Sequence, residues 1–167
     1  MKIIIIGLGN PILGDDGVGV RVVNMLKEQI DIDDSIEIRV EDVGGLELAE
    51  MILGYDAAII VDAAITQRYP VGTVFVKNIN EYPYTVHTVN PHDINFIMGI
   101  SLFRRLFPEK IPDKIIVIGI EINANSLKFS NVLSPEIKNA AEKAVEIILK
   151  LLNLIRRGVQ CDYKISN

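Results

Sequence analysis

Apolar runs alternate along the chain with segments of helical spacing. Residues 2–6, 57–61 and 115–120 are nearly uninterrupted runs of apolar, mostly β-branched residues. Such runs are typical of strands buried on both faces of a parallel sheet. Residues 36–40 alternate between apolar and polar positions, and residues 73–77 follow a turn, so both segments predict strands nearer the sheet edges.

Four segments between these strands have the spacing of amphipathic helices: 16–30, 46–53, 93–107, and a last helix that Ser134 caps and Gly158 ends. For the third helix we expect one buried face, formed by Ile94, Ile97, Met98, Ser101, Leu102 and Leu106. The order of strands and helices predicts an α/β fold, a three-layer αβα domain with a central, mostly parallel five-stranded sheet. We expect residues 1–157 to form this single domain and residues 158–167 to be a C-terminal tail.

Composition and charge narrow the functional class. The chain has 167 residues, of which 49% are apolar, yet no apolar stretch approaches a membrane span. No secretory signal is visible and Cys161 is the single cysteine, so we expect a cytoplasmic protein without disulfides. The net charge of −5 and the lack of a basic stripe argue against nucleic-acid binding.

The glycine-rich turn at residues 7–19 follows the first strand and contains the adjacent carboxylates Asp15 and Asp16. Two acids would repel a phosphate, and Ile12 stands where a dinucleotide fingerprint requires its third glycine. One interpretation of the pair is a helix N-cap followed by a first-turn acid. For both acids in a glycine-walled loop we favour the alternative, binding of a metal or another cation.

Two further candidate ligands follow from position. Asp62 ends the third strand and His92 stands just before a helix, so both are expected at the same sheet edge as Asp16. Together they would offer two oxygens and one nitrogen to a divalent ion, with open positions for water or substrate. His87 is the alternative histidine, and a helix cap is the alternative role for His92. The zinc-protease helix motif and the serine-hydrolase elbow are both missing, so hydrolysis here would use a metal ion or a carboxylate-activated water.

Residues 7–19 (GLGNPILGDDGVG) resemble the opening signature of the hydrogenase maturation endopeptidases. The similarity continues, in the same order, through residues 45–48, 60–63, 91–93, 119–121 and 133–136. The resemblance implies an αβα fold with three metal-binding positions, which fall on Asp16, Asp62 and His92. The chain departs from the family pattern at residues 41–44 and in the tail after Gly158.

The resemblance also implies an activity. It predicts an endopeptidase that removes the C-terminal extension of the large-subunit precursor of a nickel–iron hydrogenase, with Asp16, Asp62 and His92 as the catalytic and metal-binding residues. Nickel would be presented by the precursor, and no organic cofactor is expected. The precursor would be the partner, without nucleic acid or membrane, and we expect a monomer rather than an obligate oligomer.

Two other functions stay open at this point. Peptidyl-tRNA hydrolases open with a similar turn, but they need a histidine soon after it and a basic face, which this sequence lacks. A non-catalytic nucleotide- or metal-binding regulatory α/β module is the other alternative, and the acidic turn argues against its nucleotide form.

Overall fold

A computed structural model describes residues 1–31, 33–43, 45–79 and 91–158, and the side chains of residues 91–95 lie outside the description. The strands are β1 (Ile3–Leu8), β2 (Ile36–Glu41), β3 (Ala57–Ala64), β4 (Val74–Asn78) and β5 (Lys114–Glu121). The helices are α1 (Val18–Lys27), α2 (Gly45–Met51), α3 (Pro91–Leu106) and α4 (Pro135–Arg156), with 3-10 turns η1 (Gly14–Gly17), η3 (Pro108–Lys110) and η4 (Ala124–Ser126).

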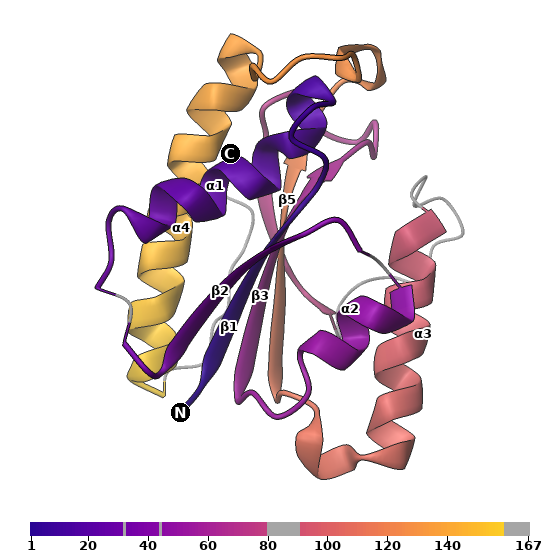
Figure 1. The fold of residues 1–167 in the computed structure, drawn as a ribbon, viewed down its shortest axis with the longest axis vertical. Coiled ribbons are helices and arrows are strands. Elements are labelled where there is room, and N and C mark those ends of the chain that lie inside the picture. Colours follow the sequence, from indigo (N-terminus) through magenta and orange to yellow (C-terminus); the bar gives the residue numbers. More distant parts are fainter. Residues whose placement is uncertain (32, 44, 80–90, 159–167) are drawn as a thin grey trace.

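The five strands form one sheet in the order β2-β1-β3-β5-β4. All neighbours are parallel except β4, which pairs antiparallel with β5 at the edge. Helices α1 and α4 cover one face of the sheet, and α2 and α3 cover the other (Figure 1). The three-layer αβα fold with a mostly parallel sheet is therefore confirmed, as is the edge position of β4.

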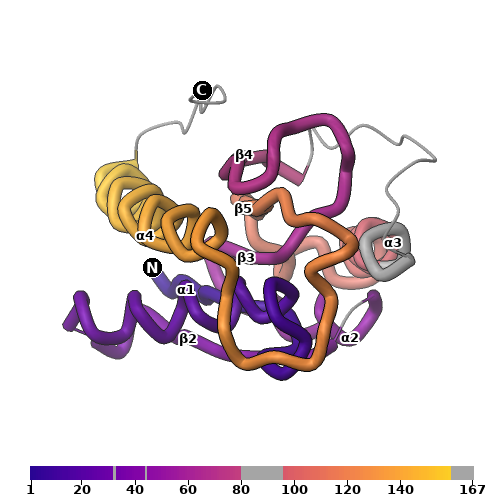
Figure 2. The backbone as a smooth tube through the Cα atoms, turned by 90° about the horizontal axis from the view of Figure 1, so that it is seen from above, coloured from indigo at the N-terminus to yellow at the C-terminus, as the bar shows by residue number. Residues whose placement is uncertain are grey.

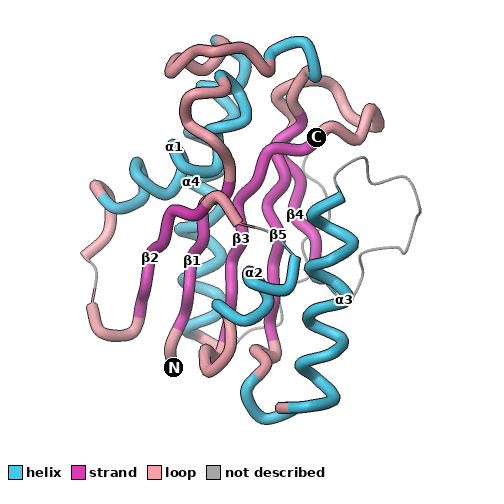
Figure 3. The backbone as a smooth tube through the Cα atoms, turned by 45° about the vertical axis from the view of Figure 1, so that its right-hand side comes forward, coloured by secondary structure: helices cyan, strands magenta, loops and turns pink. Residues whose placement is uncertain are grey.

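Each face of the sheet has its own apolar core, because successive strand residues point to opposite sides. Ile3 and Ile5 of β1 pack under α1 and α4, whereas Ile4 and Ile6 pack under α2 and α3. All four isoleucines are fully buried, which accounts for the uninterrupted apolar run in the sequence. Figure 3 shows α2 and α3 in front of the sheet. Within the described residues, no helix has the length and apolar character needed to cross a membrane.

Two local expectations were wrong, and a third was confirmed in position only. The first helix does not begin at Asp16, because residues 14–17 form the 3-10 turn η1 and Gly17 then occupies the N-cap of α1. Strand β3 does not end at Asp62, because its ladder with β5 continues to the pair of Ala64 and Glu121. Ser134 occupies the N-cap of α4 as expected, but its side chain makes no capping hydrogen bond.

The expected inner face of α3 is also wrong in part. Ile97 is half-buried against the core as expected, but Ser101 is exposed, and so are three apolar members of the expected face, Met98, Leu102 and Leu106. The helix instead buries Phe96 and Ile100. The physical reason is the packing on α2, where a Cβ added to Gly99 would lie 2.8 Å from the Cβ of Ala49. Gly99 therefore lies on the face of α3 that packs on α2, together with Phe96 and Ile100, and Met98 faces outward.

Candidate active site

Asp16 lies in η1, in the turn that joins the carboxyl end of β1 to α1, and its side chain is half-buried. Its Oδ2 accepts a hydrogen bond from the backbone N–H of Asn10 at 2.8 Å. The turn can close this tightly because Gly9 has a φ of +122°, and a Cβ there would lie 2.0 Å from the Asp16 carbonyl oxygen. The carboxylate precedes the N-terminus of α1, where the helix dipole favours negative charge.

Asp15 has a different environment from its neighbour. Its side chain is only 2% exposed, and its two oxygens accept hydrogen bonds from the backbone N–H of Ser134 at 2.7 Å and from the Ser134 Oγ at 3.0 Å. Asp15 therefore joins η1 to the start of α4, and the Ser134 hydroxyl is used for this contact rather than for a helix cap. Of the two adjacent acids, Asp16 is the one placed to meet a ligand.

Asp62 lies near the carboxyl end of β3 with a half-buried side chain, opposite Gly119 of β5. The first turn of α1 packs against the ends of β1 and β3, because a Cβ on Gly19 would lie 2.4 Å from the carbonyl oxygens of both Leu8 and Val61. The turn η1 also contacts β3. Asp16 and Asp62 therefore occupy the same edge of the sheet.

His92 lies in the first turn of α3, one residue inside the helix rather than before it. Helix α3 runs antiparallel to β1, β3 and β5, so its N-terminus points toward the carboxyl edge of those strands (Figure 1). The His92 side chain lies outside the described residues, as do His87 and Cys161. The structure thus places the backbone of His92 in a helix that begins toward this edge.

Glu121 is a further acidic residue at this edge, and its side chain is only 2% exposed. Its Oε1 accepts hydrogen bonds from the backbone N–H groups of Thr66 at 2.8 Å and Gln67 at 2.7 Å, and its Oε2 accepts one from the Thr66 hydroxyl at 2.6 Å. Glu121 therefore holds the segment that follows Asp62 and β3. In the sequence, Glu121 stands within the family motif at residues 119–121 and was not predicted as a site residue. It follows an apolar run, as Asp62 does, and this is the sequence signal that could have identified it.

The donor set fits a divalent cation in its chemistry, since two carboxylates and an imidazole suit a hard or borderline ion. Among the residues whose side chains are described, no group of three or more His, Cys, Asp or Glu side chains could hold a metal ion. A three-ligand site therefore depends on His92 or on ligands from the substrate.

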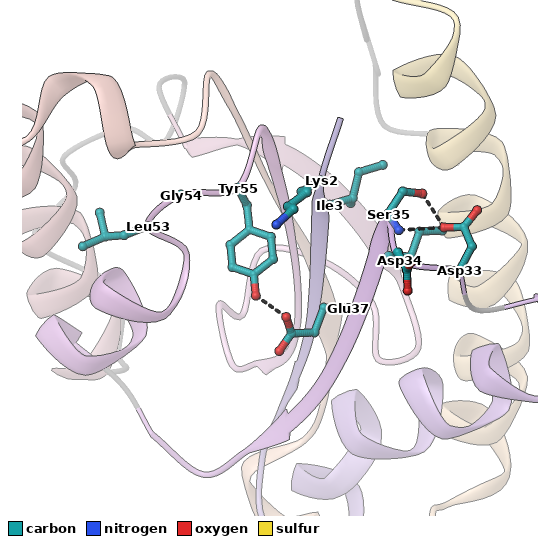
Figure 4. Close-up of a pocket in the computed structure, with 10 residues that line it drawn as sticks. Lys2, Ile3, Asp33, Asp34, Ser35, Glu37, Leu53, Gly54 and Tyr55 are labelled. Atoms are coloured by element: carbon teal, nitrogen blue, oxygen red, sulfur yellow. Dashed lines mark hydrogen bonds between the residues drawn. The ribbon is translucent and has the colours of Figure 1, made fainter.

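A hollow of about 460 Å³ lies at the opposite, amino edge of the sheet and is lined in part by Lys2, Asp33 and Tyr55 (Figure 4). The Tyr55 hydroxyl donates a hydrogen bond to Glu37, and Arg39 Nε donates another to Glu37 at 2.6 Å. Both bonds lower the pKa of the Glu37 carboxyl group, and the bond from Tyr55 has the larger effect. The hollow is remote from Asp16 and Asp62, because its lining residues precede or begin the strands.

The family model described as hydrogenase maturation protease matches residues 20–151 of the chain. The hydrogenase 2 maturation protease of Escherichia coli is 29% identical over 153 residues, covering 91% of each protein. A solved structure of the hydrogenase maturating endopeptidase HybD from E. coli has a TM-score of 0.79 and 29% identity, with 92% of this chain and 93% of that chain covered.

A second solved structure, the [NiFe] hydrogenase maturation protease HybD from Thermococcus kodakarensis, has a TM-score of 0.66 and 26% identity, covering 90% of this chain and 99% of that one. These relatives support the protease interpretation and not the regulatory-module alternative. The match of the family model spans well over half of the sequence and includes Asp62 and His92. The chain therefore belongs to the hydrogenase maturation proteases, a family of endopeptidases.

Proposed function

We propose that this protein removes the C-terminal extension from the large-subunit precursor of a nickel–iron hydrogenase, after nickel has entered that precursor. Family membership supports the reaction class, and the name of the Thermococcus relative refers to a [NiFe] hydrogenase. The observation that carries the proposal is the position of Asp16 and Asp62 at one edge of the sheet, with the helix of His92 beginning toward that edge.

In this proposal Asp16, Asp62 and His92 bind the nickel that the precursor presents, or a metal beside the scissile bond. A cation held by these residues would polarise a carbonyl and would lower the pKa of a bound water. The residues themselves hold and orient the substrate. The Asn10 N–H fixes one oxygen of Asp16, and Glu121 fixes the chain that leaves Asp62. Such fixed ligands lose little freedom when the substrate binds.

The remaining proposals concern location, domain organisation and assembly. We propose that the enzyme works in the cytoplasm as a single domain over residues 1–157, with residues 158–167 as a tail, and that it does not need a second copy of itself. The net charge of −5 supports a protein partner rather than nucleic acid. No organic cofactor enters the proposed chemistry.

The test is incubation of the enzyme with candidate large-subunit precursors, each prepared with and without nickel, followed by mass measurement of the intact products. We expect one cut that removes the C-terminal extension, and only from a nickel-loaded precursor. Equal cutting of the nickel-free form would contradict nickel recognition. Failure to cut any nickel-loaded precursor would contradict the proposed function itself.

A further inference from the structure

Four large apolar side chains are exposed on two loops at the carboxyl edge of the sheet. The exposed fractions are 88% for Phe129, 68% for Val132, 54% for Ile12 and 41% for Leu127. We call these four residues the apolar rim. Single exposed apolar side chains are ordinary on a protein surface, but a group of them on neighbouring loops marks an interaction surface.

The two loops that carry the rim are joined through their backbones. Leu13 and Ser130 form a β-bridge, the Gly14 N–H donates to the Ser130 carbonyl at 2.8 Å, and the Ser130 N–H donates to the Ile12 carbonyl at 3.0 Å. Figure 2 shows the segment before α4 lying across the turn before α1. The rim is therefore held on an ordered backbone, which reduces the entropy lost when a partner binds.

The longer of these loops has hydrogen bonds of its own. Asn123 Oδ1 accepts the N–H of Asn125 at 2.9 Å, and the Val132 N–H donates to the Ser130 Oγ at 3.1 Å. The exposure of Phe129 and Val132 is thus a feature of a defined loop conformation. Compact loops of this kind are frequently functional.

The rim adjoins the candidate active site. The loop that contains Phe129 and Val132 leads to Ser134, which is bonded to Asp15, and Asp16 is the next residue. The turn η1, which carries Asp16, also contacts η4 of the rim loop, so a polypeptide bound at Asp16 would lie beside the rim. Its apolar side chains would be covered there as the peptide binds.

A second group of exposed apolar side chains forms a stripe on α3 and serves as the control surface for the rim. Met98, Leu102 and Leu106 lie four residues apart on α3 and are 65%, 46% and 57% exposed. This stripe runs along α3 toward η3, where the Lys110 carbonyl accepts a hydrogen bond from Gly54 N–H near the start of β3. It therefore extends away from the edge that carries Asp16.

We propose that the apolar rim binds apolar side chains of the large-subunit precursor in the segment that flanks the cleavage site. This inference rests on the proposed function, because the family's substrate supplies the occupant. The rim would set the affinity for the precursor, whereas Asp16 and Asp62 would act on the scissile bond.

The test compares a rim variant, Phe129→Ser with Val132→Ser, and a stripe variant, Met98→Ser with Leu102→Ser, against the wild-type enzyme. All four positions are exposed, so both variants should fold, and thermal unfolding checks this. We expect the KM for nickel-loaded precursor to rise about tenfold or more in the rim variant, with kcat within about twofold. The stripe variant should match the wild type.

Photo-crosslinking gives a positional readout. With p-benzoylphenylalanine in place of Phe129, we expect an adduct in the C-terminal segment of the precursor, and with the same group in place of Leu102 we expect none there. An unchanged KM in the rim variant, or an equal rise in the stripe variant, would overturn the inference while leaving the proposed function intact. So would a wild-type dimer that the rim substitutions dissociate, because a second copy would then be the occupant. If the wild-type enzyme cuts no precursor, this result contradicts the proposed function, and the inference that rests on it is contradicted as well.

Discussion

Asp15 accepts both of its hydrogen bonds from Ser134, a residue 119 positions later in the chain. The side chain of Asp16, its neighbour, accepts a hydrogen bond from the local N–H of Asn10 and stays half-buried. Two adjacent aspartates in one turn therefore have separate tasks. Asp15 fixes the turn to the start of α4, and Asp16 presents a carboxylate at the edge of the sheet.

This division predicts that substitution of Asp15 lowers stability, whereas substitution of Asp16 abolishes activity and leaves stability nearly unchanged. Asp15→Ala leaves the Ser134 N–H and hydroxyl without their buried acceptor, so the free energy of unfolding should fall by about 1–3 kcal/mol. Asp16→Asn keeps an acceptor for Asn10, so stability should change by less than about 0.5 kcal/mol while precursor processing is lost. Urea unfolding of both variants measures the difference, and equal stability losses would contradict it.

Glu121 should stabilise the segment after β3. Glu121→Ala leaves two backbone N–H groups and the Thr66 hydroxyl without an acceptor, so we expect a loss of about 2–4 kcal/mol. Glu121→Gln keeps one carbonyl oxygen and should lose about half as much. Trypsin cleavage after the exposed Arg68 should accelerate in the same order, as followed by mass spectrometry. Equal cleavage rates in wild type and Glu121→Ala would show that the carboxylate does not hold this segment.

The contact of α1 with the sheet depends on Gly19. In Gly19→Ala the new Cβ would meet the backbone oxygens of Leu8 and Val61 at 2.4 Å, and neither central strand can move away easily. We expect a loss of about 3 kcal/mol or more in chemical denaturation. Gly54 is the matched control, since no atom lies within 4 Å of an added Cβ and its φ is +83°. Gly54→Ala should lower the free energy of unfolding by only about 1–2 kcal/mol, because its backbone is left-handed. Equal losses in the two variants would contradict the proposed packing of Gly19 on the strands.

The general architecture could be predicted from the sequence because its signals are local. The apolar run of β1 indicates a strand covered on both faces, and the helical spacing of residues 135–156 indicates α4. The edge of the sheet that carries the candidate site could be predicted from these elements, because the carboxyl ends of parallel strands lie at the same edge. The positions of Asp16 and Asp62 at that edge needed no long-range information beyond the strand order.

The features that escaped prediction depend on contacts between distant segments. The bond from Ser134 to Asp15 cannot be read from either local sequence, and Ser134 alone predicts an ordinary helix cap. The rotation of α3 likewise depends on Gly99 meeting Ala49 of another helix. The spacing of apolar residues within α3 indicates that one face of the helix is buried. Which face is buried depends on the contact with α2.

The Tyr55–Glu37 hydrogen bond predicts a pH-dependent stability. The pKa of Glu37 is lowered, chiefly by this bond, and the pKa of Tyr55 is raised by burial and by Glu37. A lowered carboxyl pKa gives stability that is present above the ordinary value of 4.5 and is lost as the pH falls through the folded value. A raised Tyr55 pKa gives stability that is present below 10.0 and is lost as the pH rises through the folded value.

Tyr55→Phe should therefore lower the free energy of unfolding between these limits, and the difference from wild type should shrink in acid and in strong base. The Glu37 side chain is 43% exposed, so solvent screening keeps the expected difference below about 1 kcal/mol. Urea unfolding at a series of pH values measures it. A difference that grows on acidification would have the wrong sign and would refute the account of this pair.

The central claim is that Asp16, Asp62 and His92 act together on the precursor at one edge of the sheet. The most direct measurement is the processing rate of nickel-loaded precursor by Asp16→Asn, Asp62→Asn and His92→Gln, with His87→Gln as the matched histidine control and thermal unfolding to confirm folding. We predict that each of the three site variants stays folded and loses at least about a hundredfold in rate, while His87→Gln keeps wild-type activity. Full processing by any one of the three site variants would contradict the claim.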